Sequence, residues 1–168
     1  PLANMVHNGS RGVVIIMDND TTAMTGHQDH AGIGWRVLHE NPARKIEIEP
    51  LVRALGVQKV RVADAFDVRA VEDGLMDCLA YDGPAVLITR GPCVHVVKAS
   101  KRLCEIDGGK CAACRHCLKV GCPAIMLSDE ENPGTHKKKC RIDPTLCNGC
   151  GICAQVCPFK AIHEKEAE

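Results

Sequence analysis

The chain has 168 residues with 21 basic and 21 acidic side chains, so its formal net charge of zero gives no general attraction to nucleic acid or an anionic membrane. Aromatic residues make up only 2% of the chain, too few for a platform that stacks single-stranded nucleic acid. The longest aliphatic run, Val13 to Met17, is too short to span a bilayer. No charged head followed by an apolar stretch resembles a signal peptide, and we expect neither nucleic acid nor a membrane as partner.

The first predicted element is a strand over residues 12–17. A continuous apolar run between polar residues is typical of a buried strand in a parallel sheet. The polar sequence DNDTT follows at residues 18–22, at the carboxyl end of this strand, where open α/β sheets bind ligands. The stretch over residues 25–44 contains several glycines and a proline, and its length predicts an active-site loop.

Further strands and helices alternate up to residue 89. We expect a helix over residues 49–56 that ends at a glycine, a strand over 59–63 and a strand over 84–89. Asp67 is the predicted N-cap of another helix. The apolar side of that helix is predicted to carry Val68, Val71, Leu75 and Leu79. This alternation predicts an α/β parallel-sheet domain over residues 1–99.

Twelve cysteines are the outstanding feature of the composition, and eleven of them follow residue 90. Eight form two runs, each followed by proline: Cys111, Cys114, Cys117 and Cys122, then Cys147, Cys150, Cys153 and Cys157. The first three members of the runs are 36 residues apart and the fourth members 35. Cys104 and Cys140 are also 36 residues apart. The duplication predicts two pseudo-symmetric halves within a second domain over residues 100–168.

The spacing within each run favours an iron–sulfur cluster. A cubane cluster needs four thiolates, and Cys-x-x-Cys-x-x-Cys can supply three of them from one loop. Disulfides are disfavoured because the thiols are concentrated and no secretory signal is found. Zinc is the main competitor, but it does not explain a triple run followed by Cys-Pro twice. The other four cysteines are interpreted as small apolar residues: Cys78, Cys93, Cys104 and Cys140. Cys104 and Cys140, which the repeat places equivalently, could also pack against the clusters or act as spare ligands.

The second domain resembles the bacterial two-[4Fe–4S] ferredoxin module, a small α+β fold. In that family the fourth cysteine of each run ligates the other cluster. The resemblance therefore implies a first cluster on Cys111, Cys114, Cys117 and Cys157. It implies a second cluster on Cys147, Cys150, Cys153 and Cys122. The first run has one residue more than usual between its third and fourth cysteines, which Gly121 can accommodate.

The first domain carries MDNDTTAMTGHQ at residues 17–28, which is similar to the second half of the thiamine-diphosphate motif of 2-oxoacid:ferredoxin oxidoreductases. Residues 4–34 most closely resemble the large (alpha) subunits of indolepyruvate:ferredoxin oxidoreductases. The resemblance implies that the Asn19 side-chain oxygen and the Thr21 carbonyl bind Mg²⁺. It implies that thiamine diphosphate is lined by Thr22, Ala23 and Met24. His27 and His30, in the following loop, are weaker candidates for general acid–base catalysis.

The family's activity is the oxidative decarboxylation of arylpyruvates with thiamine diphosphate and coenzyme A, with electrons passing through two [4Fe–4S] clusters to ferredoxin. The clusters imply a reducing compartment, so we expect a cytoplasmic protein. A small beta subunit is the implied partner, and the basic run over residues 136–141 could dock an acidic ferredoxin. The first half of the family's motif, which begins with Gly-Asp-Gly or Gly-Asp-Ser, has no counterpart here. We therefore expect the C-terminal portion of a larger subunit, inactive alone. Two alternatives stay open: a relative acting on pyruvate, 2-oxoglutarate or branched 2-oxo acids, and a stand-alone electron carrier.

Overall fold

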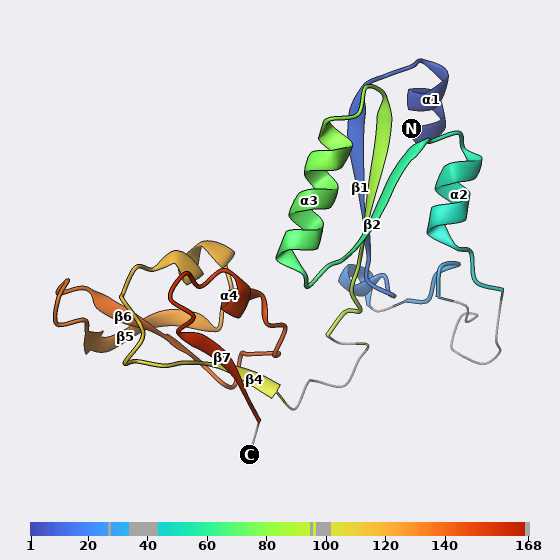
Figure 1. Ribbon diagram of the computed structural model, residues 1–168. Helices are drawn as coiled ribbons and strands as arrows, with labels where there is room; N and C mark the ends of the chain where they lie inside the picture. The colour runs from blue at the N-terminus through green and yellow to red at the C-terminus, as the bar shows by residue number, and fades with distance from the viewer. Residues whose placement is uncertain (27, 34–43, 95, 97–101, 167–168) are drawn as a thin grey trace. The chain divides into compact units, whose positions relative to one another are not determined.

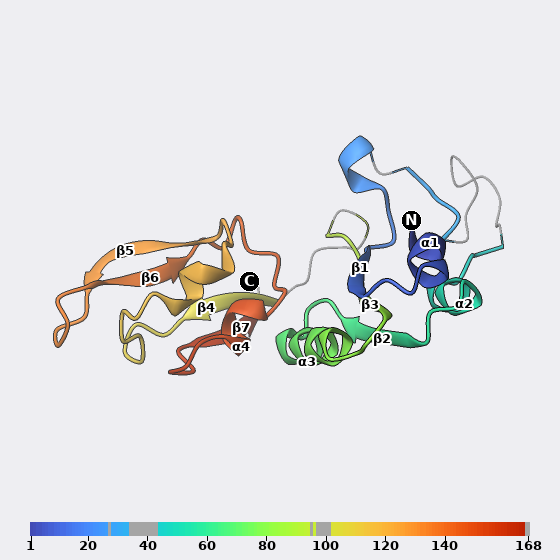
Figure 2. The same ribbon diagram turned by 90° about the horizontal axis from the view of Figure 1, so that it is seen from above.

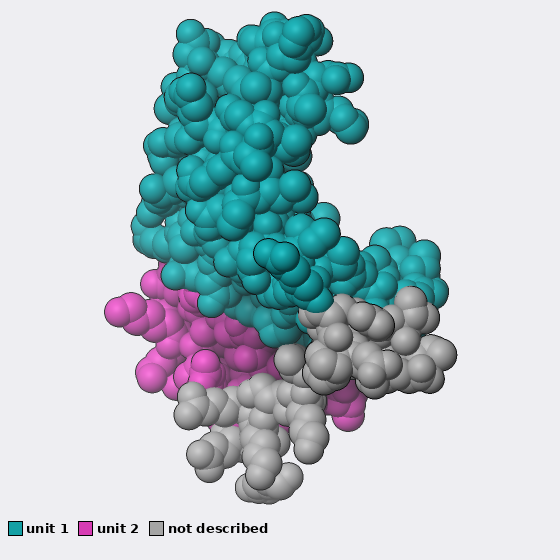
Figure 3. Space-filling view, turned by 90° about the vertical axis from the view of Figure 1, so that its right-hand side faces the viewer, with its two compact units in different colours: residues 1–97 teal, residues 98–168 magenta. Residues whose placement is uncertain are grey.

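The computed structural model describes residues 1–26, 28–33, 44–94, 96 and 102–166. The chain divides into two compact units, Pro1–Val97 and Lys98–Glu168, which are coloured separately in Figure 3. Within the described residues, no helix combines the length and the apolar character needed to cross a membrane.

The first unit is a parallel three-stranded sheet with helices on both faces (Figure 1). Strand β3 lies between β1 and β2, and helix α3 covers one face while α1 and α2 cover the other (Figure 2). The elements in chain order are α1 (Leu2–His7), β1 (Gly12–Asp18), η1 (Ala23–Thr25), α2 (Ile48–Ala54), β2 (Lys59–Asp64), α3 (Val68–Leu79) and β3 (Pro84–Arg90). The predicted α/β parallel-sheet class is confirmed, with each predicted strand and helix in place.

The core of this unit is centred on β3, whose side chains alternate between the two helical layers. Val86 and Ile88 pack in the cluster that includes residues of α1 and α2, and Leu87 packs in the cluster that includes α3. All three are completely buried. A continuous apolar sequence is what a strand covered on both faces requires.

Two details of the sequence interpretation were wrong. Strand β1 is not buried throughout. Among the described residues β3 is its one strand neighbour, and α3 packs mainly on β2 and β3. Its side chains Ile15 and Met17 are therefore 50% and 81% exposed. On α3, Leu79 is 51% exposed and Cys78 is buried instead. The buried stripe runs through Gly74 and Cys78, four residues apart on one helical face.

The N-cap of α3 gives a direct test of how this unit is stabilised. The Asp67 side chain accepts a hydrogen bond of 3.0 Å from the backbone N–H of Ala70. Asp67→Ala is expected to lower the free energy of unfolding by about 1 kcal/mol, since it leaves a helical N–H without its acceptor. Asp67→Asn keeps the acceptor and should stay close to the parent chain. Urea denaturation followed by circular dichroism measures both, and equal losses in the two variants would contradict the capping role.

The second unit is built from two copies of one strand–helix–strand pattern. Its elements in chain order are β4 (Arg102–Ile106), η3 (His116–Val120), β5 (Ile125–Glu131), β6 (Lys138–Ile142), α4 (Ile152–Gln155) and β7 (Ile162–Glu166). Adding 36 to the bounds of β4 gives those of β6, and adding 36 to the first residue of η3 gives the first residue of α4. The predicted pseudo-symmetric halves are thus confirmed. The shared core contains three equivalent pairs: Cys104 and Cys140, Cys117 and Cys153, and Ile125 and Ile162.

The two copies exchange strands. Strand β4 pairs with β7, and β5 pairs with β6, both antiparallel, so each two-stranded sheet takes one strand from each copy. Equivalent backbone hydrogen bonds close the two sheets. The N–H of Asp107 donates to the carbonyl of Ala161, and the N–H of Asp143 donates to the carbonyl of Ala124, both at 2.8 Å.

Candidate functional site

Strand exchange places the fourth cysteine of each run beside the other run. Cys157 shortly precedes β7, and β7 pairs with β4, which leads into the run that begins at Cys111. Cys122 shortly precedes β5, and β5 pairs with β6, which leads into the run that begins at Cys147. Each fourth cysteine is therefore carried across to the run of the opposite copy.

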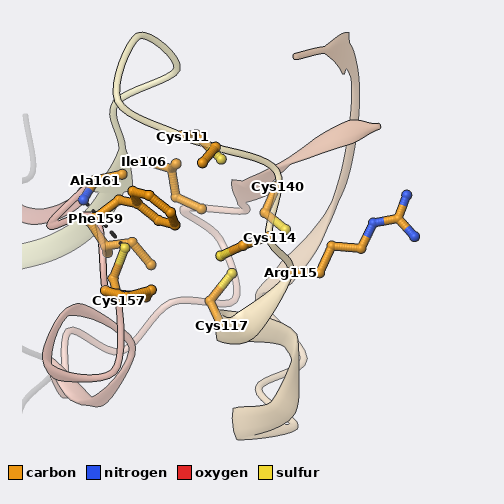
Figure 4. A pocket seen from close by; sticks show the side chains of 12 residues that line it. Ile106, Cys111, Cys114, Arg115, Cys117, Cys140, Cys157, Phe159 and Ala161 are labelled. Carbon is orange, nitrogen blue, oxygen red and sulfur yellow. Dashed lines mark hydrogen bonds between the residues drawn. The ribbon is translucent and has the colours of Figure 1, made fainter. Parts of the chain in front are cut away.

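The first cavity contains the four thiols that the resemblance assigns to the first cluster. The cavity and its opening to solvent together span about 320 Å³ of space free of protein atoms. Cys111, Cys114, Cys117 and Cys157 line it together with Cys140 and a mainly apolar surround (Figure 4). The Cys157 sulfur also accepts a hydrogen bond of 3.3 Å from the N–H of Ala161. Such N–H···S contacts are one of the means by which a protein adjusts a cluster's potential.

The second cavity repeats this arrangement with the thiols assigned to the second cluster. With its opening to solvent it spans about 330 Å³, and its lining includes Cys122, Cys147, Cys150, Cys153 and Cys104. The Cys147 sulfur accepts a hydrogen bond of 3.4 Å from the N–H of Cys104. Four thiols around an otherwise mainly apolar space suit the donor set of a [4Fe–4S] cluster. The assignment of ligands within each cavity stays a prediction.

The thiols are spread around each cavity. In the part of the chain that the structure describes, no three His, Cys, Asp or Glu side chains lie close enough together to hold a single ion. The thiols are not joined to each other, since all twelve cysteines are free.

Burial governs the acidity of the thiols at the centre of each run. It raises the pKa of Cys117 to about 12, with a contribution from the neighbouring Cys140 thiol. It raises the pKa of Cys153 to about 12 as well, with a contribution from Cys104. Both groups are protonated in the metal-free chain at neutral pH. Iron binding must therefore displace these protons, as it does wherever a thiolate ligates a metal.

The loop after β1 holds the residues predicted to bind Mg²⁺ and thiamine diphosphate. The Asn19 side-chain oxygen accepts a long hydrogen bond of 3.3 Å from the backbone N–H of Thr21. Thr21 itself is buried, with 7% of its surface exposed. The hydroxyl of Thr22 donates to the carbonyl of Gln28 at 2.7 Å and closes the loop. Met24 is fully exposed. The oxygens of Asn19 and Thr21 are the kind that a hard cation prefers.

This loop is fastened to the segment that follows β3, which sequence reasoning missed. The carbonyl of Asn19 accepts from the N–H of Cys93, and the carbonyl of Asp18 accepts from the N–H of Gly91, both at 3.0 Å. The Asp18 side chain is 9% exposed and forms an ion pair of 3.3 Å with Arg90. The pairing of β1 with β3 brings these residues together, and no local motif indicates it.

The remaining predicted residues have mixed outcomes. His27 lies outside the described residues. His30 is half-buried, and its Nδ1 accepts a hydrogen bond of 3.0 Å from the N–H of Gly32 within its own loop. In the basic run, Lys138 pairs with an aspartate and Lys139 with a glutamate across the β5–β6 hairpin, each at 3.4 Å. Much of the charge proposed for ferredoxin docking is therefore compensated within the hairpin.

Comparisons with known proteins agree with the iron–sulfur unit. Residues 141–163 match the family of 4Fe-4S binding domains. The pyruvate synthase subunit PorD of Methanothermobacter marburgensis is 40% identical over 57 residues, covering 34% of this chain and 58% of that protein.

Relatives that match along nearly the whole chain share one description. The indolepyruvate oxidoreductase subunit IorA of Archaeoglobus fulgidus is 39% identical over 96% of this chain. The subunit of the same name from Pyrococcus horikoshii is 36% identical over 97% of this chain. The chain spans about a quarter of these relatives, 26% and 25% of their lengths. Residues 1–89 match the C-terminal TPP-binding domain of thiamine pyrophosphate enzymes, and the chain belongs to that family.

Proposed function

We propose that the second unit carries electrons through two [4Fe–4S] clusters. Cys111, Cys114, Cys117 and Cys157 would hold one, and Cys147, Cys150, Cys153 and Cys122 the other. The observation that carries this proposal is the strand exchange that gathers four thiols, three from one copy and one from the other, around each cavity. The match to 4Fe-4S binding domains supports it.

We further propose that the chain belongs to an enzyme that oxidatively decarboxylates indolepyruvate with coenzyme A and reduces ferredoxin. The names of the IorA relatives support this substrate. Thiamine diphosphate would supply the electron sink for decarboxylation. Asn19 and Thr21 would hold its Mg²⁺ at the carboxyl end of β1. The proposed setting is the cytoplasm, with a small second subunit and with ferredoxin as the electron acceptor.

A second candidate is an enzyme of the same class with a different 2-oxo acid as substrate. The resemblance of the iron–sulfur unit to a pyruvate synthase subunit favours it. The complete enzyme that contains this chain distinguishes the two. Under anaerobic conditions with coenzyme A and ferredoxin, indolepyruvate should be oxidised with the highest kcat/KM. A preference for pyruvate, 2-oxoglutarate or a branched 2-oxo acid would favour the second candidate, and no oxidation of any 2-oxo acid would favour a plain electron carrier.

The Mg²⁺ role of Asn19 leads to a prediction in the same enzyme. Asn19→Ala removes an oxygen ligand but touches neither cysteine run. Turnover at a fixed concentration of thiamine diphosphate should fall at least roughly tenfold, because loss of even an outer-shell partner of a metal ligand costs about that much. Excess Mg²⁺ should restore part of the lost turnover. Iron content should not change. Asn4→Ala, at an exposed asparagine of α1, is the matched control. Equal turnover in the two variants would contradict the assignment.

A further inference from the structure

Each cavity contains a fifth cysteine that the two ligand sets do not use. Cys140 on β6 lines the first cavity and Cys104 on β4 lines the second. Both are 5% exposed, and the repeat places them at equivalent positions. A buried thiol at the same point of both cavities indicates a shared role toward what the cavities hold.

The contacts of the two thiols are also equivalent. Cys140 lines the first cavity together with Cys117, and Cys104 lines the second together with Cys153. All four pack in one core cluster, and the two thiols of each pair are within hydrogen-bonding reach. Figure 4 shows Cys140 beside Cys114 and Cys117, on the side of the cavity away from Cys157. The partner in each case is the third cysteine of the run, the one that is buried in each copy.

Cluster binding fixes the direction of these hydrogen bonds. Cys117 and Cys153 lose their protons when they become cluster ligands, so their sulfurs can only accept. Four ligands complete a cubane cluster, and a fifth thiolate in a mainly apolar cavity would be an uncompensated buried charge. Cys140 and Cys104 therefore keep their protons and are the groups left to donate.

We propose that Cys140 and Cys104 are positioning residues that donate S–H···S hydrogen bonds to the cluster ligands Cys117 and Cys153, and so raise the reduction potentials of the two clusters. This inference rests on the two-cluster function proposed above. The reduced cluster carries one more negative charge than the oxidised cluster, so a donor to a ligating sulfur stabilises the reduced form more. The two thiols act separately, one on each cluster.

The test uses Cys140→Ala and Cys104→Ala in the full chain, reconstituted anaerobically with iron and sulfide. EPR-monitored redox titration should show that each variant lowers the potential of one cluster and leaves the other unchanged, and the double variant should lower both. Iron per chain should not change. Cys140→Ser retains a hydroxyl donor in nearly the same volume, so it should shift the potential less than Cys140→Ala. Cys78→Ala, at a buried thiol of the first unit that donates to the Val86 carbonyl, should shift neither potential.

The outcomes separate this inference from the function on which it rests. Unshifted potentials in both alanine variants, with both clusters present, would mean that the thiols only pack and would overturn the inference. Loss of one cluster's iron in a single alanine variant would also overturn it, since the thiol would then be a ligand. Failure of the parent chain to take up two clusters would instead overturn the proposed function.

Discussion

Replacing Cys157 together with Cys114 is expected to leave one cluster, whereas replacing Cys157 together with Cys150 is expected to leave none. The pairing of β7 with β4 brings Cys157 to the cavity of Cys114, so the first double variant damages one site twice. The second double variant damages both sites, because Cys150 lines the other cavity. Iron per chain should fall from about eight to about four in the first case and to about zero in the second, if each cluster needs all four thiolates.

Serine is the replacement of choice, since it changes the volume least, and iron and acid-labile sulfide are measured after anaerobic reconstitution. Cys78→Ser combined with Cys93→Ser, outside both runs, should keep the full iron content. Ligation within each run would reverse the result. In that case Cys157 with Cys150 would leave one cluster and Cys157 with Cys114 would leave none.

Leu87→Ala should destabilise the first unit by about 3 kcal/mol, the cost of removing a fully buried leucine and leaving a cavity. Leu87 is in the central strand, is 0% exposed, and packs against the α3 layer. A Cβ atom added at Gly74 of α3 would lie only 3.0 Å from the Cδ1 atom of Leu87. The strand and the helix are therefore in close contact at this point. Leu79→Ala, at the exposed leucine of α3, is the matched control and should cost well under half as much.

Urea denaturation of the two leucine variants, followed by circular dichroism, measures this difference. The iron content of Leu87→Ala should equal that of the parent chain, because the cysteine runs belong to the other unit. Equal destabilisation by the two substitutions would contradict the packing of the central strand described here.

Local patterns in the sequence were sufficient for most of the fold. The apolar runs of β1 and β3 and the capping aspartate Asp67 each act through neighbouring residues, so their elements could be predicted. The exposure of Ile15 could not, because it depends on how far α3 extends over the sheet. Leu79 lies outside the buried stripe for a similar reason, because a rotation of the helix by one residue moves that stripe.

The site was predictable where the repeat encoded it. The duplicated spacing indicated two sets of thiols, and the strand pairs β4–β7 and β5–β6 show how the chain gathers them. The 36-residue offset between Cys104 and Cys140 was visible as well, but only their burial and cavity positions indicate a function. The link from Asp18 to Arg90 spans 72 residues and depends on tertiary pairing alone.

The most direct test of the two-cluster proposal is the iron and acid-labile sulfide content per chain after anaerobic reconstitution, with EPR of the dithionite-reduced form. The two cavities predict about eight iron and about eight sulfide, and the spectrum of two interacting S = 1/2 centres. Zinc with little sulfide would contradict the electron-transfer function, and the proposed oxidoreductase would lose its route for electrons.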